Sequence, residues 1–473
     1  MKYLAVILFS LISLFSFAQN AYEIKVTLKP FKNQYIYLGH YYGKQLPIID
    51  SARLNDKSQA VFKGDKKLPG GIYLIGFPDR AHHFEIAIDK NQIFSVIADT
   101  AKIESAVFQN SPENVEFKAY QQFMKKNGLA IDSLTKKRSK VSAADSIKIN
   151  GQIEAINTKI KTYRNDIIAK NGNGLLAVLL KAMKEPEVPV NDPAAKTDSM
   201  FAYKYFKKHY WDGVNFYEDR PVRTPIFEPK LDKYFEQLVY PDPDSVNKEL
   251  DWMLGYASIN EEMQKFLLIK FVNRYLSQKY MWEDAVFVHL FDTYFANKTY
   301  PWLNAESKKI ITDRAYSLMA NIMGHPAADI ELPDTNNKKT SLYNVQSPYT
   351  LVAIWDPTCS HCKTMIPKLD SIYHNRWKAM GIKLFAMAKE TDGNKESWLN
   401  FIHDHKLKDW THVYYSKEAD KARIDSGIPG YSQLYDVQTF PTLYLLDKDK
   451  RIIAKKVTED QVDQILAMKQ KQH

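Results

Sequence analysis

The segment Trp355-Asp-Pro-Thr-Cys-Ser-His-Cys362 contains both cysteines of the 473-residue chain. Two residues separate the cysteines, which is the spacing of the CxxC redox motif. The apolar run Tyr349-Thr-Leu-Val-Ala-Ile-Trp355 comes directly before the motif and predicts a buried strand. The residues after it predict a helix that continues to about Met380. A redox pair between a buried strand and a helix therefore defines the C-terminal third of the chain.

The predicted helix gives the two cysteines different tasks. Cys359 is expected at the helix N-terminus, where the helix dipole and the free N–H groups favour a thiolate. A thiolate is the form that attacks a disulfide, and Cys362, one turn further on, can resolve the mixed disulfide. His361 stands between them. A protonated imidazole there would stabilise the Cys359 thiolate, and a side chain pointing into solvent is the alternative.

Other meanings of the CxxC spacing fit this sequence less well. Haem attachment requires a histidine directly after the second cysteine, where this chain has Lys363. A zinc site requires four ligands, and His403 and His405 would face different sides of a predicted helix. A structural disulfide stays open, although a bond across so short a loop gains little stability. We expect no metal and no cofactor beyond the redox-active disulfide.

The C-terminal part of the chain alternates between predicted strands and helices. This order corresponds to a βαβ unit followed by a ββα unit, which is an α/β architecture. Strands are predicted at 349–355, 382–388, 412–415, 442–446 and 451–454, and helices at 359–380, 395–405 and 459–469.

The motifs of this part resemble those of thioredoxin-fold proteins of the TlpA/ResA-like disulfide-reductase group. The residues that match the W-x-P-x-C-x-x-C pattern of that group are Trp355, Pro357, Cys359 and Cys362. Pro367 matches the proline that kinks the active-site helix in the family, and residues 324–330 approximate the segment that leads into its domain. The resemblance implies a thioredoxin fold and thiol–disulfide exchange.

A second matching motif is Thr439-Phe-Pro-Thr442, which is followed by a strand and Asp447. It resembles the cis-proline segment of the same family. The resemblance implies that Pro441 is cis and packs beside the disulfide, and that backbone at Phe440 pairs with an extended substrate peptide, as in β-augmentation. A trans proline at the start of a strand is the alternative.

Two positions depart from the family pattern. Many thioredoxins carry a buried acid where this chain has Ala353, and many relatives carry a glutamate where it has Met365. Such a carboxylate helps to move the proton of the resolving thiol. Asp356 and Glu390 are the candidates to replace it, and the proton route is therefore open.

Upstream of this domain, the pattern changes twice. Period-two alternation before residue 105 predicts a small antiparallel sandwich or barrel, and helical periodicity prevails from Ser111-Pro112 onward, including one long helix from about Ile131 to Lys170. The upstream part resembles envelope proteins that place a β-rich module and a helical module, both of unknown function, before such a domain. We predict domains at 19–105 (β-rich), 106–320 (α-helical) and 321–473 (thioredoxin-like).

Residues 1–18, MKYLAVILFSLISLFSFA, have the pattern of a secretory signal peptide. A lysine precedes an apolar run, and Ser16 and Ala18 fit the small-residue rule before a cleavage site. The run is shorter than the ~20 residues of a membrane-spanning helix, and an uncleaved anchor is the alternative. We expect cleavage near Ala18 and a mature protein in the periplasm or cell envelope, where disulfides form.

The composition is that of an ordinary globular protein, with 45% hydrophobic and 25% charged residues. The formal net charge of +10 arises from 65 basic and 55 acidic residues. These charges are spread along the chain, whereas nucleic-acid binding requires a concentrated basic stripe. We expect no nucleic-acid partner.

Together these features predict a secreted oxidoreductase that reduces disulfides of envelope client proteins and is recharged by a membrane thiol-transfer protein. The alternative is a client-binding or chaperone-like scaffold in which the cysteine pair is secondary. The aromatic segments 205–211 and 280–282 are candidates for a client surface, although at helical spacing such residues are usually core.

Overall fold

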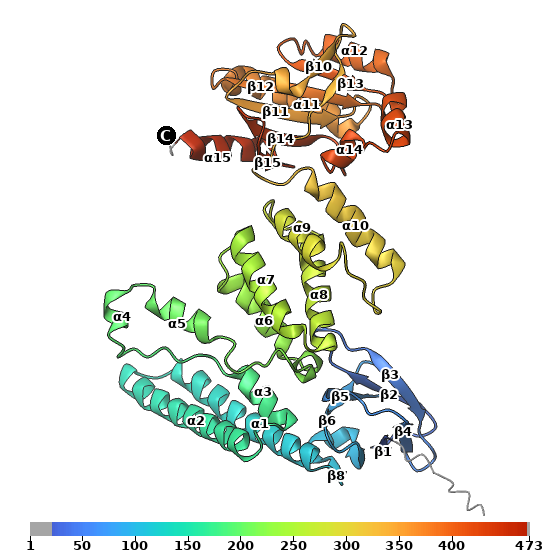
Figure 1. Ribbon diagram of the computed structural model, residues 1–473. Coiled ribbons are helices and arrows are strands. Elements are labelled where there is room, and N and C mark those ends of the chain that lie inside the picture. Colours follow the sequence, from blue (N-terminus) through green and yellow to red (C-terminus); the bar gives the residue numbers. More distant parts are fainter. Residues whose placement is uncertain (1–20, 471–473) are drawn as a thin grey trace, which may run out of the picture. The chain divides into compact units, whose positions relative to one another are not determined.

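The computed structural model describes residues 21–470 (Figure 1). They form two compact units, one with the chain up to residue 239 together with 252–266, the other with 240–251 and the chain from 267 onward. The predicted leader at 1–18 lies outside the described residues. Between residues 21 and 470, no helix combines the length and the apolar character needed to cross a membrane.

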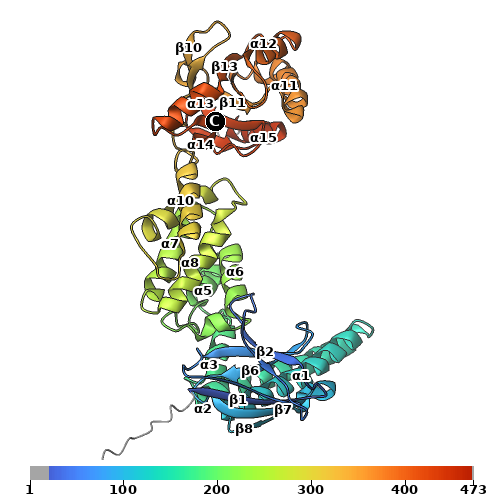
Figure 2. The same cartoon turned by 90° about the vertical axis from the view of Figure 1, so that its right-hand side faces the viewer.

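The first unit begins with two four-stranded sheets of order β4-β1-β7-β8 and β3-β2-β5-β6. The strands are β1 (Tyr22–Lys29), β2 (Tyr35–His40), β3 (Ile48–Arg53), β4 (Gln59–Gly64), β5 (Gly71–Gly76), β6 (His83–Ile88), β7 (Ile93–Asp99) and β8 (Val107–Gln109). Figure 2 shows β2 and β6 in one layer and β1 and β7 in the other. Alternate β1 side chains, Ile24, Val26 and Leu28, are buried in a core shared by both sheets. The predicted β-rich sandwich is confirmed.

One strand pair departs from the predicted antiparallel pattern. β1 and β7 run parallel, with Ile24 opposite Phe94. Five other strands separate them along the chain, so no hairpin fixes their relative direction. β3 has side chains that are all exposed or half-buried, so apolar alternation does not mark this strand in the sequence.

The single long helix predicted from Ile131 to Lys170 is wrong. The chain instead forms α1 (Pro112–Arg138) and α2 (Ala143–Lys170), which pack together through the rings of Phe123 and Tyr163 at 4.2 Å. The break occurs because Ser142 caps α2, with its hydroxyl accepting a hydrogen bond from the N–H of Asp145. Polar residues throughout both helices concealed this start signal.

Further helices complete the first unit and open the second. Within segment 205–211, Tyr210 and Trp211 are buried, so this part of the segment is core. The helices are α3 (Leu175–Met183), α4 (Ala194–Thr197), α5 (Phe201–His209), α6 (Phe227–Gln237), α7 (Pro243–Ala257), α8 (Glu261–Leu276), α9 (Glu283–Tyr294) and α10 (Ala305–Met319).

The second unit ends in a five-stranded sheet of order β13-β12-β11-β14-β15, which confirms the predicted α/β architecture. The strands are β11 (Tyr349–Trp355), β12 (Ile382–Lys389), β13 (Thr411–Tyr415), β14 (Thr442–Asp447) and β15 (Ile452–Lys455). The helices are α11 (Ser360–Ile372), α12 (Lys395–Asp404), α13 (Lys417–Asp425), α14 (Tyr431–Leu434) and α15 (Glu459–Gln470). The sequence prediction missed α13, α14 and the short hairpin of β9 (Glu331–Pro333) and β10 (Lys339–Ser341).

β11 holds the centre of this sheet, parallel to β12 and antiparallel to β14. Leu351, Ala353 and Trp355 pack under α11, α12 and α15, whereas Val352 and Ile354 pack under the opposite layer. Burial on both faces explains why the strand is continuously apolar. The strand ends at Trp355, and the cysteine loop follows directly.

Candidate redox site

Cys359 is the N-cap residue of α11, with extended backbone at φ −65° and ψ 125°. Its carbonyl accepts a hydrogen bond from the N–H of Lys363 at 3.1 Å, and its own N–H donates to the carbonyl of Asp356 at 3.2 Å. The side chain is half-buried, whereas Cys362 is fully buried, and both cysteines are free thiols. The outer sulfur is therefore reachable by a partner and the inner sulfur is shielded.

Burial raises the pKa of the Cys362 thiol to about 12. The Cys359 sulfur and the charge of Asp356 raise this pKa further, while the backbone of Asp356 acts in the opposite direction. At neutral pH the inner cysteine is thus a neutral thiol and needs a proton acceptor before it can attack a disulfide.

The buried carboxylate of Asp356 organises the loop before the cysteines. The backbone N–H and the hydroxyl of Thr358 both donate to its Oδ1 at 2.7 Å, and the hydroxyl of Thr391 donates to its other oxygen. Thr391 follows β12, far away in the sequence, and no motif marked it. These bonds fix the residue that directly precedes the nucleophile.

The segment around Pro441 forms the other side of the site. The thiol of Cys359 donates to the carbonyl of Phe440, with sulfur and oxygen 3.8 Å apart. The Phe440–Pro441 peptide bond is cis, and both side chains are half-buried. The structure therefore brings together Cys359, Phe440 and Pro441, which the sequence separates by about 80 positions.

The remaining predicted residues have supporting positions. Trp355 is fully buried, with its ring 5.0 Å from that of Phe401, and Pro357 is buried in the loop. Pro367 lies inside α11 and has no N–H, so the carbonyl of Lys363 lacks its helical donor.

His361 points to solvent, as one of the two interpretations had it. Its side chain is exposed. The pKa of nearby Glu459 is lowered mainly by the hydrogen bond from Lys368, and His361 is the smallest of the causes. No hydrogen bond joins it to Cys359.

Ala353 and Met365 occupy the two positions at which many related proteins carry an acidic side chain, so neither position supplies a carboxylate here. Of the two candidate replacements, Asp356 acts on the pKa of Cys362. Glu390 instead accepts a hydrogen bond from the hydroxyl of Tyr414 at 2.8 Å. The charge of Asp356 makes only a small contribution to the raised pKa of Tyr414. Of these two carboxylates, therefore, only Asp356 contributes to the raised pKa of the Cys362 thiol.

Among residues 21–470, no three His, Cys, Asp or Glu side chains gather in a way that could hold a metal ion. The site therefore consists of two thiols, one carboxylate and backbone groups.

Comparison with known proteins agrees with this geometry. Residues 347–452 match a family described as thioredoxin-like. The C-terminal domain is thioredoxin-like. Upstream, residues 22–117 and 132–321 match two families described only as domains of unknown function, DUF4369 and DUF5106.

Curated relatives and solved structures are similar to parts of this chain. The thiol-disulfide oxidoreductase ResA of Bacillus cereus is 24% identical over 149 residues, which make up 32% of this chain and 78% of that protein. A domain of a possible thiol-disulfide isomerase from Cytophaga hutchinsonii is 31% identical, covering 32% of this chain and 95% of that chain with a TM-score of 0.28. A thioredoxin-like protein from Bacteroides caccae is 20% identical, covering 60% and 98%, with a TM-score of 0.42.

The difference in burial predicts selective alkylation. Iodoacetamide near neutral pH is expected to modify the reduced protein once, on Cys359, because a thiol with a pKa of about 12 is ionised in only ~1 molecule in 10⁵ at pH 7. Mass spectrometry of the intact protein and its peptides measures this. The Cys362→Ser variant should keep the single adduct and Cys359→Ser should lose it; rapid double labelling of the native protein would contradict the prediction.

The Asp356 carboxylate predicts a shift in the pKa of Cys362. Asp356→Asn should lower that pKa, because a negative charge that opposes thiolate formation is removed, while burial still keeps it above the ordinary value. NMR titration of the Cys362 Cβ signal in a Cys359→Ser background measures the shift. Glu390→Gln is the matched control and should leave the titration unchanged; an equal response of both variants would remove the special role of Asp356.

Proposed function

We propose that the protein is a thiol–disulfide oxidoreductase of the cell envelope that reduces disulfides of client proteins. The observation that carries this proposal is the half-exposed Cys359 sulfur at a helix N-terminus, 3.8 Å from the Phe440 carbonyl and one turn before the buried Cys362. The similarity to thiol-disulfide oxidoreductases and the thioredoxin-like match over residues 347–452 support it.

The reaction begins when the Cys359 thiolate attacks one sulfur of a client disulfide. A bond between Cys359 and that sulfur forms, and the other client sulfur leaves as a thiolate that takes up a proton. Cys362 then loses its proton to a base and attacks the Cys359 sulfur, which releases the second client thiol. Two electrons pass from the dithiol to the client, and the protein is left with a Cys359–Cys362 disulfide.

Asp356 is the proposed proton acceptor for the second step. It is the buried carboxylate that already acts on Cys362, and Ala353 and Met365 offer none. A carboxylate beside a neutral thiol supplies the general base that a pKa of about 12 requires.

The proposed direction is reductive, as in the disulfide-reductase group that the motifs resemble. The oxidised pair then needs a dithiol donor, for which a membrane thiol-transfer protein is the proposed class. The proposed location is the periplasm, which rests on the leader pattern at 1–18. N-terminal sequencing of the protein secreted by a Gram-negative host should give Gln19 as the first residue, and a retained Met1 would contradict secretion by cleavage.

The function is tested with the cysteine variants and the reduction potential. Cys359→Ser should reduce disulfide exchange to the uncatalysed background, whereas Cys362→Ser should accumulate a mixed disulfide between Cys359 and the client. Equilibration with dithiothreitol or glutathione buffers should give a potential of about −250 mV or below for a reductase, near thioredoxin.

The other outcomes of this experiment are equally specific. A potential of about −120 to −150 mV would make the protein an oxidant or isomerase. A pair that neither oxidises nor reduces would end the enzyme proposal in favour of a client-binding scaffold.

A further inference from the structure

A cleft of about 990 Å³ adjoins the thioredoxin-like domain inside the second compact unit. One wall comes from residues 276–281, between α8 and α9, and from Ile310, Asp313, Arg314 and Ser317, which share one face of α10. The facing wall contains Asp436 and Gln438 from the segment before Pro441, and residues 455–457 from the end of β15 and the turn that follows it. Helical module and redox domain thus line one cleft.

The cleft lies near the redox site along the chain, although Cys359, Phe440 and Pro441 are not among its lining residues. Gln438 lies two residues before Phe440, and the Phe440 carbonyl is 3.8 Å from the Cys359 sulfur. Two extended residues span at most ~7 Å. The N–H of Lys456, another residue of the lining, donates to the carbonyl of Leu443 at 2.7 Å, two residues after Pro441. A chain bound at Cys359 therefore reaches the cleft within a few residues.

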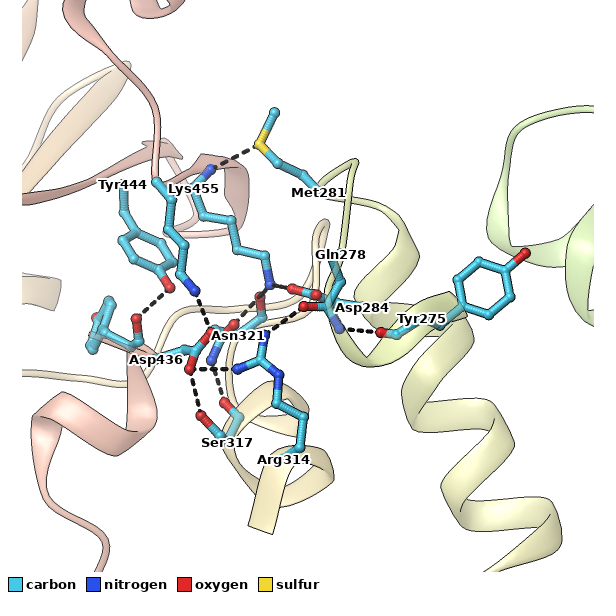
Figure 3. Close-up of polar contacts among 12 residues, drawn as sticks. Tyr275, Gln278, Met281, Asp284, Arg314, Ser317, Asn321, Asp436, Tyr444 and Lys455 are labelled. Atoms are coloured by element: carbon cyan, nitrogen blue, oxygen red, sulfur yellow. Dashed lines mark hydrogen bonds and ion pairs between the residues drawn. The ribbon is translucent and has the colours of Figure 1, made fainter. Parts of the chain in front are cut away.

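Buried charges form the floor of the cleft, and they are paired with one another. The Lys455 ammonium donates to the backbone carbonyl of Asn321 at 2.7 Å and to its side-chain oxygen at 2.8 Å. It also forms an ion pair with Asp284 from α9, and both side chains are more than 90% buried (Figure 3).

A second group of paired charges lies beside the first. Arg314 donates to Asp436 Oδ1 at 2.7 Å, Ser317 donates to the same oxygen at 2.8 Å, and Lys456 pairs with the other oxygen (Figure 3). A small ion would have to break these bonds at a large desolvation cost. The floor is therefore poorly suited to hold a small charged ligand.

The rim of the cleft exposes large apolar side chains beside polar ones such as Asp313 and Gln438. Tyr280 is 51% exposed, Met281 36% and Ile310 51%. Tyrosine and methionine are enriched in protein interfaces, and methionine adapts its shape to varied partners. Such a rim above a satisfied polar floor fits a polypeptide with apolar side chains.

We infer that this cleft binds the stretch of client polypeptide next to the disulfide under attack, so that the helical module helps to select the client. The inference rests on the proposed thiol–disulfide exchange. Its occupant is an extended segment with apolar residues near its cysteine, because Gln438 of the cleft lies two residues from Phe440 and the cleft exposes Tyr280, Met281 and Ile310.

The test compares a polypeptide substrate with a small one, using the full mature chain. Ile310→Asp places a charge on the rim, and should lower kcat/KM about tenfold with insulin, mainly through KM. The exchange rate with oxidised glutathione should stay within twofold, because so small a disulfide does not reach the rim. Ile424→Asp, on exposed α13 at 60% exposure and outside the cleft, is the matched control and should change neither rate.

Each outcome decides the inference. An equal loss of rate with both substrates, or no loss of kcat/KM with insulin, would overturn the inference, provided that circular dichroism and thermal melting show that the variants are folded. Ile310→Leu keeps an apolar side chain and should retain the insulin rate. If Ile310→Asp instead turned a dimer into a monomer in analytical ultracentrifugation, the cleft would be a self-interface and the inference would fail. A native protein inactive with both substrates would refute the proposed function itself.

Discussion

The burial of β11 on both faces is the constraint on which the redox domain depends. β11 is buried up to its last residue, Trp355. The loop that follows is fixed by the Asp356 carboxylate, and α11 begins at once. The same apolar layer encloses Cys362, so the packing that stabilises the sheet also sets the unequal chemistry of the two thiols.

Buried ion pairs hold the helices of the second unit against this sheet. Transfer of each ion from water costs several kcal/mol, which the pairing only roughly offsets. The pair of Lys455 with Asp284 therefore contributes little net stability, yet the loss of one partner alone costs about 3–5 kcal/mol. Any other packing of α9 and α10 against the sheet would leave these buried charges unpaired and is therefore disfavoured. The pairs thus give the adjoining cleft a defined shape.

The sequence predicted the parts of the fold that depend on local patterns. The apolar run before Cys359, the alternation in β1 and the proline at Pro441 each carry their information within a few residues. The break between α1 and α2 was missed because the exposed faces around Ser142 show no periodicity. The parallel pairing of β1 with β7 was missed because long-range topology decides strand direction.

The site divides in the same way. Both cysteines and their neighbours follow from one motif, whereas the contribution of Thr391 depends on where β12 ends beside β11. The sequence offered Asp356 and Glu390 as equal candidates, and only the distribution of buried charge separates them. The sequence marked only segment 280–282 of the cleft lined by α10, because the other lining residues become its neighbours only through tertiary packing.

The presence of only two cysteines also bears on how this chain matures. A chain with four cysteines has three ways to pair them, whereas a chain with two has a single one. Oxidation during folding therefore cannot produce a scrambled isomer, and no proofreading of its own disulfides is required.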